Sequence, residues 1–268
     1  MSERSEYAPG EFCWVDLATS DPEAAAKLYG ELLGWETQPA GPAEETGGYA
    51  FFLRDGKQVA GYGPLQGEGQ PPAWASYVKV ADADQNAEKV RQAGGNVLIG
   101  PFDLPADSGR MAVIADPSGA IVCSMQQKQH QGAQLVNEVG SWTWNQLATP
   151  DLEAAKDFYG TVFDWELEQS EEAPPDSPYW MWQVGGQRWE EGLAGAMVMG
   201  DDMPPGTPPH WMVYFAVADA DAAIETVKRH GGNLVFGPQD IPVGRLAVFT
   251  DPQGAAFAVI QPDYPEAR

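Results

Sequence analysis

Residues 14–36 read WVDLATSDPEAAAKLYGELLGWE, and residues 144–166 repeat this stretch as WNQLATPDLEAAKDFYGTVFDWE. The longer segments 10–36 and 140–166 align without a gap, and 13 of their 27 residue pairs are identical. Three more motifs recur in the same order, namely VADAD at 80–84 and 217–221, GGN at 94–96 and 231–233, and DPSG or DPQG at 116–119 and 251–254. The chain of 268 residues is therefore a tandem duplication.

Each copy begins with a predicted strand that leads into a helix. In the first copy residues 12–18 form the strand, and Asp21 is a good N-cap for the helix. Pro22 suits the first helical position because its missing N–H would have no partner there. Apolar residues then recur at helical spacing, which predicts one buried face. Further on, Asp55-Gly56 predicts a hairpin, and a second helix is predicted over roughly residues 84–93.

The ordered motifs resemble the vicinal oxygen chelate superfamily, which includes glyoxalase I, extradiol dioxygenases, and bleomycin- and fosfomycin-resistance proteins. The motifs that carry the resemblance are DPEAAAKLYGELLGW, VADAD and DPSG with their second copies. It implies an α+β fold of tandem βαβββ modules, with curled mixed sheets that form cups and helices on the outer faces. We expect the modules at residues 9–128 and 139–263, joined by a polar linker over 129–138. The segments PFDLPADSGR and PQDIPVGR are similar to a two-module glyoxalase-like subgroup.

Enzymes of this superfamily hold a divalent metal in the cup through His, Glu or Gln side chains. The resemblance places the corresponding positions at Trp14, Ala75 and Cys123 in the first copy, and at Trp144, Met212 and Ala258 in the second. None of these residues is a histidine or a carboxylate, and Fe, Mn, Ni or Mg sites need such hard or imidazole ligands. We therefore expect that both inherited metal centres are lost and that the protein uses no cofactor.

Strand parity predicts which side chains line the cups. Val15 and Leu17 form the apolar side expected to face the helix, so the alternate residues face the other way. The candidate ligand-binding residues are Trp14, Asp16, Tyr77, Cys123, Trp144, Gln146, His210, Met212 and Tyr214.

Several of these candidates have a structural alternative. A tryptophan at the start of a strand, such as Trp14 or Trp144, often packs in a core. Asp16 could serve as a base if burial raises its pKa, but it could equally be exposed or paired with Arg110. Cys123 fits inert packing, because nothing basic lies near it in the sequence to form a thiolate.

The three histidines offer little for a metal site. His130 lies in the linker and His230 at the end of a helix, and both positions indicate a structural or solvent-exposed role. His210 shares the parity of Met212 and is a candidate for the rim of the second cup, although Pro208-Pro209 before it indicates a loop.

Composition excludes several kinds of partner. Acidic residues outnumber basic ones 39 to 15, and a net charge of −24 repels phosphate backbones and anionic membrane surfaces. No apolar run approaches the roughly 18 residues of a membrane span. Two cysteines in apolar segments, with no secretory signal before them, indicate reduced thiols and a cytoplasmic protein. We expect a small-molecule ligand, and either a monomer or a homodimer.

The leading hypothesis is metal-independent binding of a small apolar or aromatic metabolite, either to sequester it or to assist its conversion. One alternative is a metal-dependent lyase, isomerase or dioxygenase with relocated ligands that include His210. Another is a protein-interaction module whose cups are filled by its own side chains.

Overall fold

The computed structural model describes residues 3–171, 173, 178–186, 193–200, 203–204 and 206–263. The first sheet is built from β1 (Phe12–Thr19), β2 (Glu36–Pro39), β3 (Ala50–Arg54), β4 (Lys57–Pro64), β5 (Ala73–Lys79), β6 (Asn96–Asp103), β7 (Gly109–Ala115) and β8 (Ile121–Gln127). Its helices are α1 (Pro22–Leu33), the short α2 (Ala43–Thr46) and α3 (Ala83–Gln92), and a 3-10 turn covers Pro105–Asp107.

The second sheet repeats this plan. Its strands are β9 (Trp142–Thr149), β10 (Trp165–Gln169), β11 (Trp180–Val184), β12 (Ala194–Val198), β13 (His210–Ala216), β14 (Asn233–Ile241), β15 (Gly244–Thr250) and β16 (Ala256–Pro262). Its helices are α4 (Leu152–Phe163) and α5 (Ala220–Arg229).

Both sheets have eight strands in the same mixed order. The first runs β2-β3-β4-β1-β5-β8-β7-β6, and the second runs β10-β11-β12-β9-β13-β16-β15-β14. β1 pairs in parallel with β4, and β5 pairs in parallel with β8, whereas the two central strands β1 and β5 are antiparallel. Each module thus contains two βαβββ units side by side, one level of repetition beyond the tandem copies. The predicted α+β class and the mixed sheets are confirmed.

The local signals in the sequence explain where the helices and turns lie. The Asp21 side chain accepts a hydrogen bond from the backbone N–H of Ala24, and Pro22 opens the helix, as predicted. Asp82, Asp151 and Asp219 cap the other three long helices in the same way. At the predicted hairpin, Asp55 and Gly56 join β3 to β4 with φ angles of 52° and 74°.

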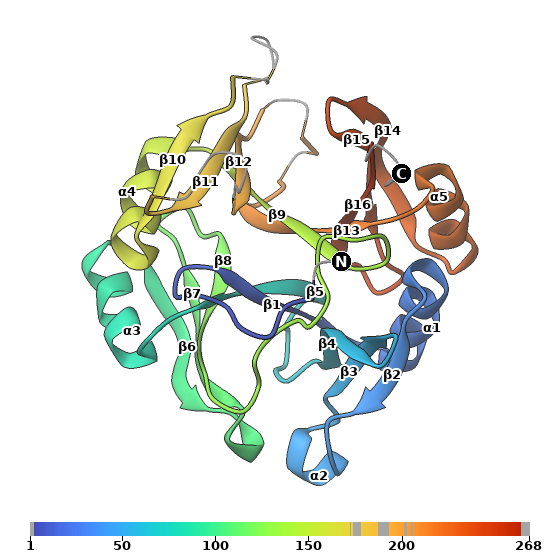
Figure 1. Cartoon of the computed structure of the whole chain (residues 1–268), viewed down its shortest axis with the longest axis horizontal. Coiled ribbons are helices and arrows are strands. Elements are labelled where there is room, and N and C mark those ends of the chain that lie inside the picture. The colour runs from blue at the N-terminus through green and yellow to red at the C-terminus, as the bar shows by residue number, and fades with distance from the viewer. Residues whose placement is uncertain are drawn as a thin grey trace.

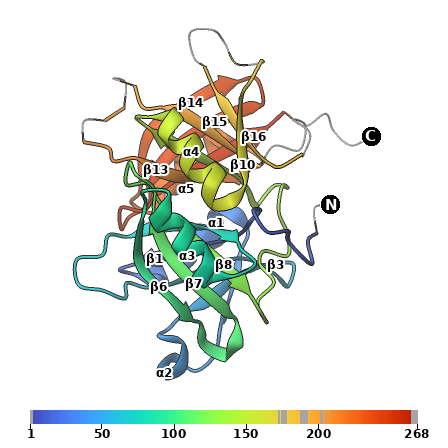
Figure 2. The same ribbon diagram turned by 90° about the vertical axis from the view of Figure 1, so that its left-hand side faces the viewer.

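The two modules pack against each other through their helix-bearing faces. Figure 1 shows α1 beside α5 on one flank and α3 beside α4 on the other, and Figure 2 shows α3 and α4 adjacent from the side. Between the sheets, the ring of Phe12 lies 5.3 Å from Trp165 and 5.3 Å from Trp211. The helices therefore cover the sheet faces opposite the cups, and the helix-free faces of the two sheets look away from each other (Figure 1).

Two matching hydrogen-bond chains tie the modules together. The Trp74 indole donates to the Tyr29 hydroxyl at 2.9 Å, and Tyr29 donates to Asp251 of the other module at 3.2 Å. Their repeats Trp211, Tyr159 and Asp116 make the same chain in the opposite direction. The aspartate of each DPxG motif thus holds its own turn with one oxygen and a helix of the other module with the second.

The segment between the sheets is better packed than its polar composition suggests. Ala133, Leu135 and Val136 are buried, and the Ala133 N–H donates to the carbonyl of Cys13 in β1. Residues 129–138 therefore lie against the first module rather than hanging free. Both cysteines are buried free thiols, and among the described helices none is long and apolar enough to cross a membrane.

Candidate functional site

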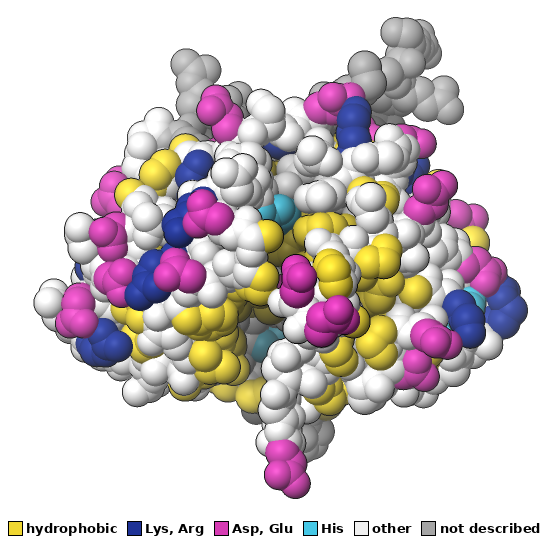
Figure 3. Space-filling model, turned by 90° about the horizontal axis from the view of Figure 1, so that it is seen from below, with side chains coloured by type: hydrophobic (Ala, Val, Ile, Leu, Met, Phe, Trp, Pro, Cys, Tyr) yellow, Lys and Arg dark blue, Asp and Glu magenta, His cyan; other side chains and the backbone are white. Residues whose placement is uncertain are grey.

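The helix-free face of the first sheet gathers side chains from its central strands. Trp14 of β1 lies opposite Tyr77 of β5, and Tyr77 lies opposite Cys123 of β8, so the three form a row across the sheet. Asp16 is two residues beyond Trp14 and therefore shares its face. We call this face, with Trp14, Asp16, Tyr49, Tyr77 and Cys123, the first cup. Figure 3 shows the molecule from below the view of Figure 1, on the side of the first module, where a hollow with hydrophobic walls is visible.

Asp16 is the centre of a hydrogen-bond cluster in the first cup. Its Oδ2 atom accepts from the Tyr49 hydroxyl at 3.0 Å and from the Tyr77 hydroxyl at 2.9 Å. The Tyr49 oxygen in turn accepts from the indole N–H of Trp14 at 3.0 Å. One carboxylate oxygen thus fixes two phenols and, through one of them, the plane of an indole.

Burial sets the protonation states in this cluster. It raises the pKa of Asp16 to about 6, against the opposing effect of the hydrogen bonds from Tyr77 and Tyr49. Burial and then the Asp16 charge raise the pKa of both tyrosines well above 10, so they remain donors. Burial, with a further contribution from Asp16, also raises the pKa of the Cys123 thiol, which fits the predicted inert packing.

The predicted alternative of a salt bridge between Asp16 and Arg110 is wrong. Arg110 lies on β7 and pairs with Asp84 at 2.8 Å and Asp103 at 3.2 Å. The groups that shift the pKa of Asp16 are Tyr77 and Tyr49, apart from burial itself. The carboxylate therefore has no cationic partner among the described residues.

The second sheet repeats the cluster with one chemical change. The Trp144 indole donates to the Tyr179 hydroxyl at 3.0 Å, and Tyr179 and Tyr214 both donate to Oε1 of Gln146, at 3.0 and 3.1 Å. Trp144 and Tyr214 are paired across β9 and β13, and Ala258 continues the row on β16. We call this face, with Trp144, Gln146, Tyr179, Met212 and Tyr214, the second cup. The carboxylate of the first cup is here an amide, which does not titrate.

A glycine in each cup makes room for the bridging tyrosine. A β-carbon on Gly61 of β4 would overlap the Tyr49 hydroxyl, and one on Gly195 of β12 would overlap the Tyr179 hydroxyl. Gly61 is paired with Asp16, and Gly195 with Gln146, so each glycine lies directly beside the acceptor that its tyrosine reaches. The close approach is therefore built into the strand sequence.

The linker places a histidine in the first cup. The His130 ring meets the Trp14 indole edge-on at 4.4 Å and lies 5.9 Å from Phe51. Burial lowers the pKa of His130 to about 4, so the imidazole is neutral at physiological pH, and its Nε2 atom is buried without a hydrogen-bond partner among the described residues. The prediction of a structural or solvent-exposed role missed this contact with the cup.

His210 and Met212 lie on β13 of the second module. His210 is partly exposed, and its Nδ1 is 2.8 Å from the Pro208 carbonyl. Met212 is paired with Gln146 and is therefore next to the cluster, whereas His210 is paired with Ala148, one step further towards the rim. The third histidine, His230, lies outside both cups, where its Nε2 contacts Glu31 at 2.7 Å.

The side chains at the inherited metal positions do not fit a metal ion. In the first cup an indole, a methyl group and a buried neutral thiol occupy them, and the indole N–H is already donated to Tyr49. In the second cup they are an indole, a thioether and a methyl group. Nowhere in the described ranges do three or more His, Cys, Asp or Glu side chains gather closely enough to hold one. We therefore assign no metal-dependent step to these positions.

Sequence reasoning did not single out Tyr49, which connects Trp14 to Asp16, or its counterpart Tyr179 in the second cup. A signal was present, because Tyr49 and Tyr179 are 130 residues apart, the same offset as Trp14 and Trp144.

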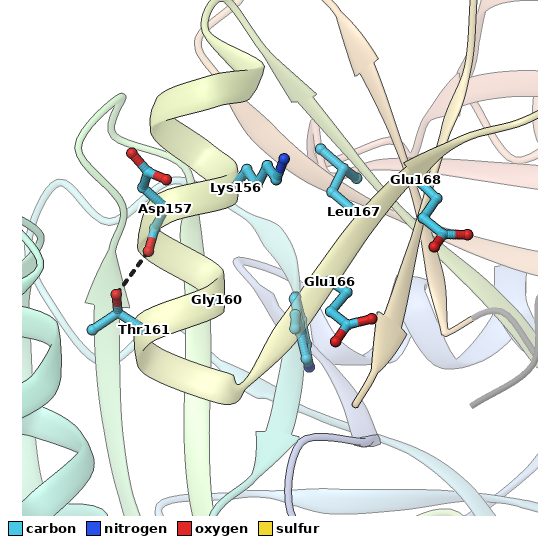
Figure 4. Close-up of a pocket in the computed structure, with 8 residues that line it drawn as sticks. Lys156, Asp157, Gly160, Thr161, Glu166, Leu167 and Glu168 are labelled. Carbon is cyan, nitrogen blue, oxygen red and sulfur yellow. Dashed lines mark hydrogen bonds between the residues drawn. The ribbon is translucent and has the colours of Figure 1, made fainter. Parts of the chain in front are cut away.

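A separate surface depression of about 500 Å³ lies between α4 and β10 (Figure 4). The Thr161 hydroxyl is used within the helix, where it donates to the Asp157 carbonyl at 2.9 Å. The carboxylates of Glu166 and Glu168 point away from α4, so the polar groups do not converge on one point (Figure 4). We do not assign a function to this depression.

Comparison with known proteins agrees with the resemblance seen in the motifs. The family model of the Glyoxalase/Bleomycin resistance protein/Dioxygenase superfamily matches residues 12–123 and 139–259. CFP32 of Mycobacterium tuberculosis, whose name provisionally designates a glyoxylase, is 41% identical over 98% of both chains. The anthracycline biosynthesis protein DnrV of Streptomyces peucetius is 34% identical over 96% of this chain and 95% of its own.

Solved structures with this fold include metal enzymes. The Mn(II)-bound glyoxalase from Novosphingobium aromaticivorans has a TM-score of 0.59 at 14% identity, covering 96% of this chain and 85% of its own. The 2,2',3-trihydroxybiphenyl 1,2-dioxygenase of Sphingomonas wittichii has a TM-score of 0.61 at 16% identity, covering 95% and 91%. The duplicated sheets, the family model and the full-length relatives together place this chain in the glyoxalase/bleomycin resistance protein/dioxygenase superfamily.

Proposed function

We propose that the protein binds small, flat, apolar or aromatic molecules in its cups without a metal ion. The observation that carries this proposal is the cluster of tryptophan, two tyrosines and one amide or carboxylate acceptor, which is present in both cups at and beside the inherited metal positions. The same hydrogen bonds recur in both copies, so the cluster has a defined geometry in each cup.

The geometry of the cluster favours stacking with an aromatic ligand. Hydrogen bonds hold the indoles of Trp14 and Trp144 in fixed orientations. The partly exposed Trp144 indole presents a rigid aromatic face at little cost in side-chain entropy. The Trp14 indole is only 2% exposed and packs against Phe51 and His130, so in the first cup it supports the residues that a ligand would contact. Small-molecule sites are typically apolar, with a few well-placed polar groups. Asp16 and Gln146 are both partly exposed, and they supply those polar groups.

The relatives support the same class of ligand. A protein named for anthracycline biosynthesis aligns with nearly the whole chain, and anthracyclines are built on flat, fused aromatic rings. The two buried free thiols and the excess of acidic side chains support a cytoplasmic protein that does not bind nucleic acid.

A titration with 4-nitroanisole tests the proposal, because this flat aromatic compound has no acidic hydrogen and quenches tryptophan fluorescence. We expect saturable binding by calorimetry, with one site per cup. Trp144→Ala should abolish the site in the second cup, because it removes a partly exposed aromatic side chain. Trp14 is buried, so Trp14→Ala should abolish the first site by releasing Tyr49 from its hydrogen bond, and a thermal melt shows whether the variant is folded. Unsaturable binding, or binding that survives both substitutions together, would count against the proposal.

A further inference from the structure

The Asp16 carboxylate in the first cup has one oxygen in use and one free. Oδ2 accepts both tyrosine hydrogen bonds, whereas Oδ1 has no partner among the described residues. The Asp16 side chain is partly exposed and Oδ1 is not fully buried, so this oxygen reaches the open space of the cup. A carboxylate oxygen with free lone pairs is an acceptor for a hydroxyl donor.

A difference between the two cups keeps this oxygen uncovered. In the second cup, Met197 of β12 is paired with Ala148, and its sulfur lies 3.0 Å from Nε2 of Gln146. In the first cup, Gly63 of β4 is paired with Ala18 and takes the corresponding place. The methionine therefore covers the free end of Gln146, whereas the glycine has no side chain with which to cover Asp16.

The charges around Asp16 select a neutral proton donor. The titratable groups that face it are the hydroxyls of Tyr49 and Tyr77 and the thiol of Cys123, all of which stay protonated. His130 meets the neighbouring Trp14 indole edge-on and is neutral. No cation among these groups offsets the carboxylate, so an anionic ligand would be repelled. A hydroxyl that gives its proton to the carboxylate meets no such repulsion.

We infer that the first cup binds aromatic compounds through a weakly acidic hydroxyl, a phenol or an enol, whose proton is shared with or transferred to Oδ1 of Asp16. On full transfer the ligand O–H bond breaks, its electron pair stays on the ligand oxygen, and an O–H bond forms on Asp16. The second cup, with Gln146 in place of the acid, binds without proton transfer. This inference rests on the proposed binding function and adds the class of ligand to it.

The comparison of 4-nitrophenol with 4-nitroanisole tests the role of the proton, because in 4-nitroanisole a methyl group replaces the hydroxyl hydrogen and the rest of the molecule is the same. In the first cup we expect 4-nitrophenol to bind at least about tenfold more tightly, as a charge-assisted hydrogen bond predicts. Bound nitrophenol should also absorb closer to the phenolate wavelength than the free phenol does. The preference should weaken below pH of about 6, where Asp16 becomes protonated.

Three variants separate Asp16 from its surroundings. Asp16→Asn should bind both probes equally in the first cup. Gly63→Met keeps the acid and should reduce the preference, because its side chain covers the free oxygen and presses on the Tyr49 ring, 3.2 Å from a β-carbon at this position. Glu68→Gln removes an exposed carboxylate from the loop between β4 and β5, outside the hydrogen-bonded cluster, and should behave as the parent protein does. Thermal melts of each variant show that the fold is intact.

The outcomes distinguish this inference from the proposal beneath it. If neither probe binds, both are wrong. If 4-nitroanisole binds as tightly as 4-nitrophenol to the folded parent protein, or if Asp16→Asn keeps the preference, the cups bind aromatics but Asp16 does not accept a proton.

Discussion

Replacing Asp16 by asparagine is expected to raise the free energy of unfolding at pH 7 by about 1–3 kcal/mol. The reason is that burial raises the pKa of Asp16 to about 6, so ionising it in the folded protein costs more than in the unfolded chain. Two pKa units correspond to about 3 kcal/mol, and the partial exposure of the side chain lowers that figure. An amide can still accept both tyrosine hydrogen bonds, as Gln146 does in the second cup.

The effect should depend on pH in a defined direction. Between pH of about 4 and 6 the folded state holds the Asp16 proton more tightly than the unfolded state, so this residue makes the parent protein less stable as pH rises. The gain from Asp16→Asn should therefore be near zero at pH 4 and reach its full value above pH 6. His130 has the opposite effect on stability. Burial lowers its pKa to about 4, so its contribution to the free energy of unfolding falls as pH drops from about 6.5 to 4.

Urea unfolding curves at several pH values between 4.5 and 7.5 measure both contributions. The stabilisation by Asp16→Asn, measured as the change in free energy of unfolding relative to the parent protein, should rise with pH. The corresponding change for Glu68→Gln should not vary with pH. His130→Gln should stabilise the protein more at pH 4.5 than at pH 7.5. If Asp16→Asn destabilises the protein at pH 7, or if the stabilisation does not change with pH, then ionising Asp16 costs no more in the folded protein than in the unfolded chain, and the account is wrong. The expected gain also implies that Asp16 is kept for binding rather than for stability.

Removing the hydroxyls that join the two modules should destabilise the whole chain. Tyr159→Phe leaves the buried Trp211 indole without its acceptor and Asp116 without its cross-module donor, and we expect a loss of about 1–3 kcal/mol. Tyr29→Phe should cost a similar amount through Trp74 and Asp251. The two chains share no hydrogen-bond partner, so the losses should add in the double variant.

Denaturant unfolding followed by fluorescence and by circular dichroism tests this interface. Tyr62→Phe is the matched control, because Tyr62 is buried in the first module but its hydroxyl makes no hydrogen bond to the described residues. A double variant no less stable than the control would mean that the Tyr–Asp chains contribute nothing to the association of the modules.

Much of the fold could be predicted because its signals are local. The cap at Asp21, the proline after it and the hairpin at Asp55 each specify a short piece of backbone, and the repeat assigns the same pieces to the second module. Strand parity placed Trp14 and Asp16 on one face for the same reason, since alternation in a strand is fixed by the backbone.

The rest depends on side chains that arrive from other segments. Tyr49 directly precedes β3, and its hydroxyl contacts Asp16 only because Gly61 has no side chain in the way. The alternation of side chains within one strand does not predict a contact of this kind. His130 comes from a segment with no regular structure, so no periodicity marks it. Gly63 and Met197 occupy corresponding places in the two cups, but this can be recognised only from the pairing of β4 with β1 and of β12 with β9.

The most direct test of the account measures metal content and 4-nitrophenol binding on one preparation, before and after dialysis against a chelator. The protein should be purified without metal affinity steps, and its metals counted by inductively coupled plasma mass spectrometry. The account predicts far less than one metal ion per chain and an unchanged dissociation constant after chelation. One tightly held Fe, Mn, Ni or Zn per chain, with binding lost on its removal and restored on its return, would contradict it.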